Sequence, residues 1–211
     1  MKVLSAEFVT SAAAGGSVQG IPRDALPQVG MAGRSNVGKS SLLNALCRRK
    51  VARTSAAPGK TRLANVYRVA LDGGGPGRWS LYLVDLPGYG YARGGATAAE
   101  ELRAVAEAYF GTGTADGPQG LARPASLLLV DSRHPGLESD RQAAEWLAGL
   151  GVRYRVVATK IDKLSRSERA RNLRALEDIF AMPPLPVSAA SGEGLDTLWK
   201  TIASLARAGH G

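Results

Sequence analysis

The stretch GRSNVGKSS, residues 33–41, decides the fold of this chain. It follows an apolar segment of strand length at 29–32 and leads into a helical pattern of apolar residues that begins at Leu42. Glycines in such a turn let backbone N–H groups close around phosphate oxygens, and the N-terminus of the next helix adds positive potential. Lys39 suits the β- and γ-phosphates, and the Ser40 hydroxyl suits Mg²⁺, which prefers oxygen ligands. The spacing therefore predicts a phosphate-binding loop between a strand and a helix.

A second motif, DLPG at 85–88, stands where a later strand ends. It follows the apolar segment 81–84. Asp85, at the carboxyl end of a strand beside a phosphate loop, suits a second Mg²⁺ contact, usually through water, and the amide of Gly88 suits a γ-phosphate. The motif alone is a common turn, but after a phosphate loop it predicts a nucleotide site.

A third motif, TKID at 159–162, comes directly after the apolar segment 154–158. The Asp162 carboxylate can accept two hydrogen bonds from guanine, whereas adenine lacks that pair of donors. The stem of Lys160 can lie along the purine ring. The tripeptide SAA at 188–190 can offer backbone N–H groups to the guanine O6. Because a mismatched purine would leave a buried polar group unpaired, the pattern predicts guanine as the base.

Apolar patterns of strand length and of helix length alternate along the chain, which is typical of proteins built from βαβ units. They predict an α/β fold, a three-layer P-loop NTPase. Its sheet is mostly parallel and six-stranded, with one antiparallel edge strand and helices on both faces. We expect one domain at 26–207, with a loosely held N-terminal extension at 1–25 and a short tail at 208–211. The strands are expected at 29–32, 64–71, 79–84, 126–130, 154–158 and near Val187.

The composition is that of an ordinary globular protein of 211 residues, with 45% hydrophobic and 21% charged residues. The single cysteine, Cys47, cannot form an internal disulfide, which fits a reducing cytoplasm. No segment approaches the ~18 apolar residues of a membrane span, so we expect no membrane partner. The net charge of +9 favours a polyanionic partner, nucleic acid first. A genome composition that enriches Arg, Ala and Gly would give the same balance.

GRSNVGKSS, SAAPGKTR at 55–62, DLPGYGYA at 85–92, TKID and SAA together resemble the translational GTPase superclass. The combination is most similar to the EngB (YsxC/YihA) family of ribosome-biogenesis GTPases, over about residues 8–205. The resemblance implies binding of GTP and GDP with Mg²⁺. It also implies a switch role in assembly of the large (50S) ribosomal subunit and its rRNA, linked to cell division and septation. TKID begins with Thr159, where asparagine is the commoner choice in GTPases.

The resemblance also assigns residues to the site. It implies catalytic roles for Lys39, Thr61 and Gly88, and it makes Ser40 and Thr61 the magnesium ligands. Thr61 becomes the switch I threonine, which would close on Mg²⁺ and the γ-phosphate. The implied nucleotide-binding residues are Gly33, Arg34, Ser35, Asn36, Val37, Gly38, Lys39, Ser40, Ser41, Asp85, Gly88, Thr159, Lys160, Asp162, Ser188, Ala189 and Ala190.

Tyr89 stands where many GTPases place a glutamine that orients the attacking water, so slow intrinsic hydrolysis is expected. Asn36 resembles the asparagine that holds K⁺ in related assembly GTPases. Basic clusters at 48–53 and 166–174 predict a salt-sensitive surface for ribosomal RNA beside the nucleotide switch. Two alternatives stay open: a P-loop phosphotransferase, and a GTP-gated binding module in cell-division control with negligible turnover. We expect a monomer.

Overall fold

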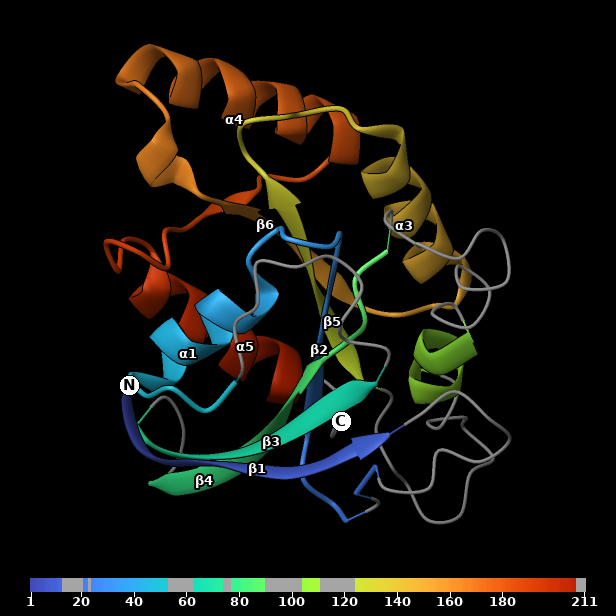
Figure 1. The fold of residues 1–211 in the computed structure, drawn as a ribbon, viewed down its shortest axis with the longest axis vertical. Coiled ribbons are helices and arrows are strands. Elements are labelled where there is room, and N and C mark those ends of the chain that lie inside the picture. The colour runs from blue at the N-terminus through green and yellow to red at the C-terminus, as the bar shows by residue number, and fades with distance from the viewer. Residues whose placement is uncertain are drawn as a thin grey trace.

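The computed structural model describes residues 1–12, 21–22, 24–52, 63–73, 77–89, 104–110 and 124–207. A mixed sheet runs through the centre of the molecule, and helices lie on both of its faces (Figure 1). The strands are β1 (Lys2–Ala12), β2 (Gln28–Gly33), β3 (Ala64–Asp72), β4 (Arg78–Asp85), β5 (Ala125–Asp131), β6 (Tyr154–Thr159) and β7 (Leu185–Pro186). The helices are α1 (Lys39–Cys47), α3 (Glu138–Gly149), the 3₁₀ turn η1 (Ile161–Lys163), α4 (Arg166–Phe180) and α5 (Leu195–Arg207), and residues 104–110 are also helical.

The strand order in the sheet is β1-β3-β4-β2-β5-β6-β7. The pairs from β4 through β2, β5 and β6 to β7 are parallel, and β3 runs antiparallel to both of its neighbours. The predicted α/β class with a mostly parallel sheet is confirmed. The predicted strand count is wrong, because the sheet has seven strands. The antiparallel strand β3 is therefore covered on its outer side and is not the edge.

The seventh strand is β1, so the expectation that residues 1–25 are loosely held is wrong for this segment. It pairs with β3 along its length, from Lys2 opposite Asp72 to Ala12 opposite Ala64. The register shifts between Val3 and Ser5 and again between Phe8 and Thr10. Each such irregularity moves the inward-facing side chains by one position, so β1 lacks the simple alternation that identifies a strand in a sequence.

Each face of the sheet carries its own core. On one face, Leu42 and Leu46 of α1 pack with Trp199 and Ile202 of α5, and the Trp199 indole N–H donates to Leu46 O at 3.2 Å. On the other face, the helical residues 104–110 pack with α3 and α4 against β4, β5 and β6. Figure 1 shows α1 and α5 together on one side and α3 on the other. The predicted three-layer arrangement is confirmed.

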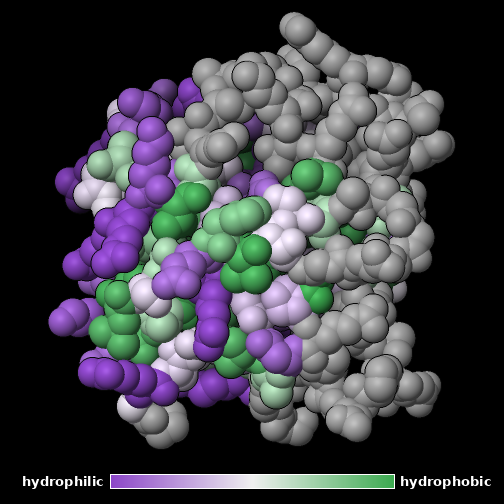
Figure 2. Space-filling model, turned by 60° about the horizontal axis from the view of Figure 1, so that its bottom comes forward, coloured by the Kyte–Doolittle hydropathy of each residue, from purple (hydrophilic) through white to green (hydrophobic). Residues whose placement is uncertain are grey.

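On the described part of the surface near β1, β3 and β4, hydrophobic side chains lie among hydrophilic ones. Figure 2 brings this side forward and shows hydrophobic and hydrophilic residues interleaved on it. Among the described residues, the large hydrophobic side chains that stay exposed are Phe8, Val9 and Leu63. No helix in the described part of the chain is both long and apolar enough to cross a bilayer.

The parallel strands bring the predicted motifs to one edge of the sheet. In parallel strands the carboxyl ends lie side by side, and loops at that edge form the usual ligand site of open α/β sheets. GRSNVGKSS follows β2, DLPG follows β4 and TKID follows β6. Asp131 ends β5, which lies between β2 and β6. The fold therefore assembles these segments although they are far apart in the sequence.

Candidate nucleotide-binding site

The loop between β2 and α1 has the backbone shape of a phosphate cradle. A Cβ atom on Gly33 would lie 2.9 Å from Leu129 O, so this position requires glycine. Gly38 has φ 109°, a left-handed conformation that glycine adopts without strain. Gly38 also precedes α1 without any side-chain cap. The first N–H groups of α1 are therefore left for a ligand, as at helix N-termini that bind anions.

Lys39 is a buried cation that spans this loop. Its ammonium donates to Gly33 O at 2.9 Å and to Arg34 O at 3.2 Å. Burial lowers the pKa of Lys39, and the Asp85 carboxylate opposes that effect. The ammonium is held above the cradle, where a phosphate oxygen would be its natural counter-charge.

Ser40 and Asp85 form a pair of oxygen donors beside Lys39. The Ser40 hydroxyl donates to Asp85 Oδ2 at 2.7 Å. Asp85 Oδ1 is buried and has no hydrogen-bond partner in the described part of the chain. Burial raises the pKa of Asp85, although Lys39 and Ser40 act in the opposite direction. A hydroxyl and an orphaned carboxylate oxygen at one point fit the oxygen preference of Mg²⁺, so these residues suit the predicted ion.

The segment after β4 closes onto the phosphate loop. The Ser35 N–H donates to Tyr89 O at 3.0 Å, and the Ser35 hydroxyl donates to Gly88 O at 3.3 Å. A Cβ atom on Gly88 would lie 2.8 Å from Ser35 N and 2.9 Å from Lys39 Nζ. Only glycine allows this approach, so the Gly88 backbone lies next to the lysine that would meet the γ-phosphate.

The Tyr89 side chain is engaged away from this point. Its phenol donates to Asp140 Oδ1 in α3 at 3.0 Å. Burial, together with the Asp140 carboxylate, raises the pKa of Tyr89, so the phenol stays protonated. A protonated phenol that is bonded to α3 cannot act as a base toward an attacking water. The residue after DLPG therefore provides no general base for the attacking water.

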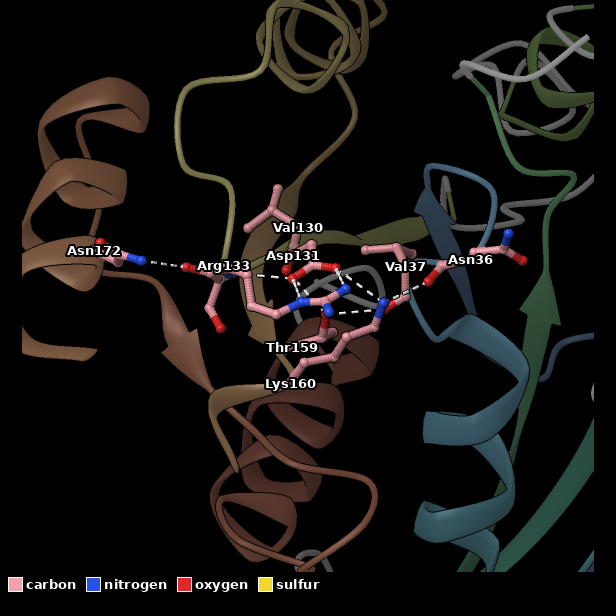
Figure 3. Close-up of polar contacts among 9 residues, drawn as sticks. Asn36, Val37, Val130, Asp131, Arg133, Thr159, Lys160 and Asn172 are labelled. Carbon is pink, nitrogen blue, oxygen red and sulfur yellow. Dashed lines mark hydrogen bonds and ion pairs between the residues drawn. The ribbon is translucent and has the colours of Figure 1, made fainter. Parts of the chain in front are cut away.

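TKID is tied to the phosphate loop through its first two residues. The Thr159 hydroxyl lies 2.9 Å from Val37 O and 3.1 Å from Val130 O. The Lys160 ammonium donates to Asn36 O at 2.7 Å (Figure 3). Threonine thus reaches the loop in the position where asparagine is commoner. The carbonyls of two consecutive loop residues, Asn36 and Val37, therefore hold the phosphate loop next to the base motif.

Asp162 is oriented by the loop after β7. Its Oδ1 accepts from the Ser188 hydroxyl at 2.7 Å, and this hydrogen bond lowers the pKa of Asp162. The Ser188 hydroxyl also accepts from the N–H groups of Ala190 and Ser191 at 3.2 and 3.1 Å. The Ala189 N–H has no partner within the described residues. Of the three residues in SAA, Ala189 is therefore the one whose amide is free to meet a base.

Ser188 was expected to offer only its backbone N–H, which instead donates to Glu193 O at 3.0 Å. Its hydroxyl connects the two base-facing loops, and sequence reasoning missed this role. An ion pair also connects the loop after β7 to α4, since Arg169 Nη2 lies 2.6 Å from Glu193 Oε1. The base side of the site is thus preformed by side-chain contacts.

Asp131 and Arg133 are further residues that sequence reasoning did not assign to the site. Asp131 ends β5, and its carboxylate caps the turn that follows, since Arg133 N–H donates to Asp131 Oδ1 at 3.1 Å. The carboxylate also accepts from the Arg133 guanidinium and from Lys160. The signal in the sequence was DSR directly after a buried strand, at the same sheet edge as the motifs.

Some predicted positions lie outside the described residues, among them Thr61 and Arg53. Ser41 is exposed on α1, and Arg34 Nε is buried without a hydrogen-bond partner in the described part of the chain. Among the described residues, no group of three or more His, Cys, Asp or Glu side chains converges as in a protein-only metal cage. The described residues therefore offer a loop with free N–H groups beside a buried lysine, a hydroxyl–carboxylate oxygen pair that suits Mg²⁺, and a carboxylate that suits a base.

This chain is similar to known proteins in sequence and in fold. Residues 28–160 match a family model described as 50S ribosome-binding GTPase. A probable GTP-binding protein EngB from Solibacter usitatus is 43% identical over 209 residues, which cover 99% of this chain and 100% of that protein. Another from Pelotomaculum thermopropionicum is 42% identical and covers 96% of each chain. These matches favour a GTPase over a phosphotransferase.

Solved structures add the fold. A crystal structure of a probable GTP-binding protein engB has a TM-score of 0.58 at 20% identity and covers 85% of this chain and 98% of that one. Era in complex with MgGDPNP and nucleotides 1506–1542 of 16S ribosomal RNA has a TM-score of 0.67 at 24% identity. That likeness covers 85% of this chain but only 56% of Era. At these identities the likeness shows the fold alone.

Proposed function

Because the chain belongs to the EngB family of GTP-binding proteins and is a GTPase, we propose that it acts as a GTP-controlled switch in assembly of the large (50S) ribosomal subunit. The observation that carries the nucleotide part is the registration of TKID on the phosphate loop, through Thr159 to Val37 O and Lys160 to Asn36 O. The ribosomal part is supported by the family description, 50S ribosome-binding GTPase. The family resemblance links the same role to cell division and septation.

Different residues of the site would bind the phosphates and the base of the nucleotide. The phosphate loop from Gly33 to Ser41 would surround the α- and β-phosphates with N–H groups, and the Lys39 ammonium would meet the β- and γ-phosphates. Asp162, oriented by Ser188 at 2.7 Å, would accept the two guanine donors. The free Ala189 N–H would donate to the guanine O6. Together these contacts favour guanine over adenine nucleotides.

The magnesium ligands would be Ser40 and Thr61, with Asp85 in contact through water. The ion, when bound, draws charge from the phosphate oxygens during hydrolysis. Ser40 now donates to Asp85 at 2.7 Å, and binding would redirect the hydroxyl oxygen to the metal. Asp85 Oδ1, buried without a hydrogen bond to any described residue, would then accept from a bound water.

Intrinsic hydrolysis is proposed to be slow. The Tyr89 phenol is bonded to Asp140 and offers no base to the attacking water, while the Gly88 amide can still orient the γ-phosphate. K⁺ at Asn36 would supply the missing positive charge. Asn36 is exposed, and its backbone is left-handed at φ 64°. Turnover in KCl should then exceed turnover in NaCl at equal ionic strength, and equal rates would remove K⁺ from the account.

Two clusters of exposed basic side chains suit rRNA of the large-subunit precursor. Arg48, Arg49 and Lys50 are exposed at the end of α1, directly before the segment that carries Thr61. On α4, Arg166, Arg171 and Arg174 are exposed. Exposed arginines gain phosphate contacts at the expense of bound counterions, so binding should weaken steeply with salt. We place the protein in the cytoplasm as a monomer with no membrane partner.

The test is co-sedimentation with large-subunit precursor particles in GDP and in a non-hydrolysable GTP analogue. We expect more protein with the particles in the analogue, and less as salt is raised. Equal sedimentation in the two nucleotides would reject the switch. A salt-independent fraction would reject the electrostatic contact.

A second candidate is a GTP-gated binding module in cell-division control with negligible turnover, which the engaged Tyr89 side chain also favours. Multiple-turnover phosphate release separates the two. Release beyond one phosphate per protein supports the GTPase switch, and release that stops at one or fewer supports the module.

A further inference from the structure

The Asp131 carboxylate is the most heavily bonded acidic group near the base motif. It accepts from Arg133 N–H at 3.1 Å, from Arg133 Nε at 2.9 Å and from Arg133 Nη2 at 2.7 Å. Its Oδ2 also accepts from Lys160 Nζ at 2.9 Å (Figure 3). Partial burial alone would raise the pKa of Asp131, but the bonds from Arg133 and Lys160 outweigh it and lower the pKa to about 2. The carboxylate is therefore ionised at neutral pH.

Lys160 is the residue that connects this carboxylate to the nucleotide site. Its ammonium lies between Asp131 Oδ2 at 2.9 Å and Asn36 O of the phosphate loop at 2.7 Å. The Lys160 backbone is left-handed at φ 62°. Its side chain passes next to Gly38, since a Cβ atom added to Gly38 would lie 4.0 Å from Lys160 Cε. The stem thus crosses the phosphate loop with its end fixed at two points. One of those points lies in the loop itself, and the other is Asp131.

The guanidinium of Arg133 restricts the carboxylate in turn. A two-point contact from one guanidinium sets both the position and the plane of a carboxylate, which a single point charge cannot do. Arg133 is half-exposed, whereas only 10% of the Asp131 side chain is exposed. The buried partner is therefore the one held in place. Arg133 therefore fixes the Asp131 carboxylate, and the Asp131 carboxylate in turn holds the Lys160 ammonium.

We propose that Asp131 is a positioning residue for purine recognition, which holds the Lys160 stem where the purine ring packs, and that Arg133 fixes the Asp131 carboxylate. Without Asp131 the Lys160 ammonium keeps only a neutral carbonyl, and the flexible four-carbon stem regains rotamers that it must lose again when a base binds. Asp131 then affects every purine nucleotide by a similar factor, because Lys160 packs on the ring and does not read its edge. The inference rests on the guanine-nucleotide site described above.

The experiment compares Asp131→Asn with the wild-type protein by fluorescence titration of a labelled GDP, with GDP and XDP as competitors. We expect about tenfold weaker GDP binding, since a bond to a charged group is lost, and an unchanged ratio of GDP to XDP affinity. Inorganic pyrophosphate, which carries no base, should compete equally well with both proteins after correction for the weaker probe. A change in the GDP to XDP ratio, or an equal loss of pyrophosphate binding, would overturn the proposal.

A double-mutant cycle tests whether Asp131 acts through Lys160. In the Lys160→Met background, Asp131→Asn should cause no further loss of GDP affinity. A full tenfold loss in that background would show that Asp131 acts otherwise and would reject the proposal. Asp178→Asn, an exposed change on α4, is the matched control and should leave GDP affinity within twofold of wild type.

Arg133→Gln provides a second variant that keeps the carboxylate and removes the guanidinium. We expect a two- to fivefold loss of GDP affinity, again absent in the Lys160→Met background. If Arg133→Gln leaves GDP affinity unchanged, or lowers it equally in the Lys160→Met background, Arg133 does not act through Asp131 and Lys160. Asp162→Asn separates this proposal from the site assignment beneath it. If that change leaves the GDP to XDP ratio untouched, the site itself is wrong, whatever Asp131→Asn does.

Discussion

The Thr159 hydroxyl is one of two side-chain groups that join the base motif to the phosphate loop, and the energetic cost of its removal can be calculated. The side chain is buried, and its Oγ1 lies 2.9 Å from Val37 O and 3.1 Å from Val130 O. Thr159→Val keeps the shape and removes the donor. One net hydrogen bond contributes ~1 kcal/mol, and leaving a buried acceptor unpaired costs ~1–3 kcal/mol. The free energy of unfolding should therefore fall by ~1–3 kcal/mol.

The same change should weaken nucleotide binding, because Val37 belongs to the cradle. A loss of about 1.4 kcal/mol in the free energy of GDP binding corresponds to roughly tenfold weaker affinity. Urea unfolding of the nucleotide-free protein and titration with labelled GDP measure the two effects separately. Thr159→Ser keeps the hydroxyl and should recover most of both, and Thr197→Val, exposed on α5, should change neither. Wild-type stability together with wild-type affinity in Thr159→Val would refute the reasoning.

Three further predictions concern other contacts. Ser188→Ala removes the donor to Asp162 and the acceptor of two amides, so GDP affinity should fall about tenfold while pyrophosphate binding holds; equal losses for both ligands would be inconsistent with a base-side role. Tyr89→Phe leaves the buried Asp140 without its phenol donor and should lower the free energy of unfolding by ~1–2 kcal/mol, with GDP affinity unchanged; an unchanged urea midpoint would contradict this. Folding lowers the pKa of Asp131 from 3.8 to about 2, so its ionised form stabilises the fold above pH ~4 and that contribution is lost as the pH falls from about 4 to about 2. Urea midpoints measured down through acid pH should fall less steeply for Asp131→Asn than for wild type, and parallel curves would exclude the effect.

The motifs could be predicted from the sequence because each is local. A glycine pattern between a strand and a helix specifies the phosphate loop, and Gly33 and Gly38 do occupy positions that need glycine. The base motif was recognised in the same way, since Asp162 and Lys160 follow one buried strand. Parallel pairing then brings such loops together without any further information from the residues.

What could not be predicted depends on contacts between distant segments. β1 was missed because two register shifts break its alternation, and its pairing partner lies more than fifty residues away. Sequence reasoning assigned Ser188 only its backbone N–H and gave Asp131 no role in the site. The Ser188 hydroxyl nevertheless donates to Asp162, and the Asp131 carboxylate accepts from Lys160. The Tyr89 phenol was judged as a replacement for glutamine, whereas its contact with Asp140 of α3 directs it elsewhere. The misses at Ser188, Asp131 and Tyr89 concern which distant group a side chain contacts, and spacing along the chain does not specify that.

The central claim is that Asp162 reads the base, and one measurement tests it most directly. Xanthine carries an oxygen where guanine carries its exocyclic amine, so an amide at position 162 should exchange one preference for the other. Hydrolysis and binding of GTP and XTP are compared in wild type and in Asp162→Asn under identical conditions. The account predicts that the affinity of the variant for GTP falls by at least about a hundredfold and that its affinity for XTP rises. A variant that still prefers GTP, or a wild-type protein that binds ATP as well as GTP, would contradict it.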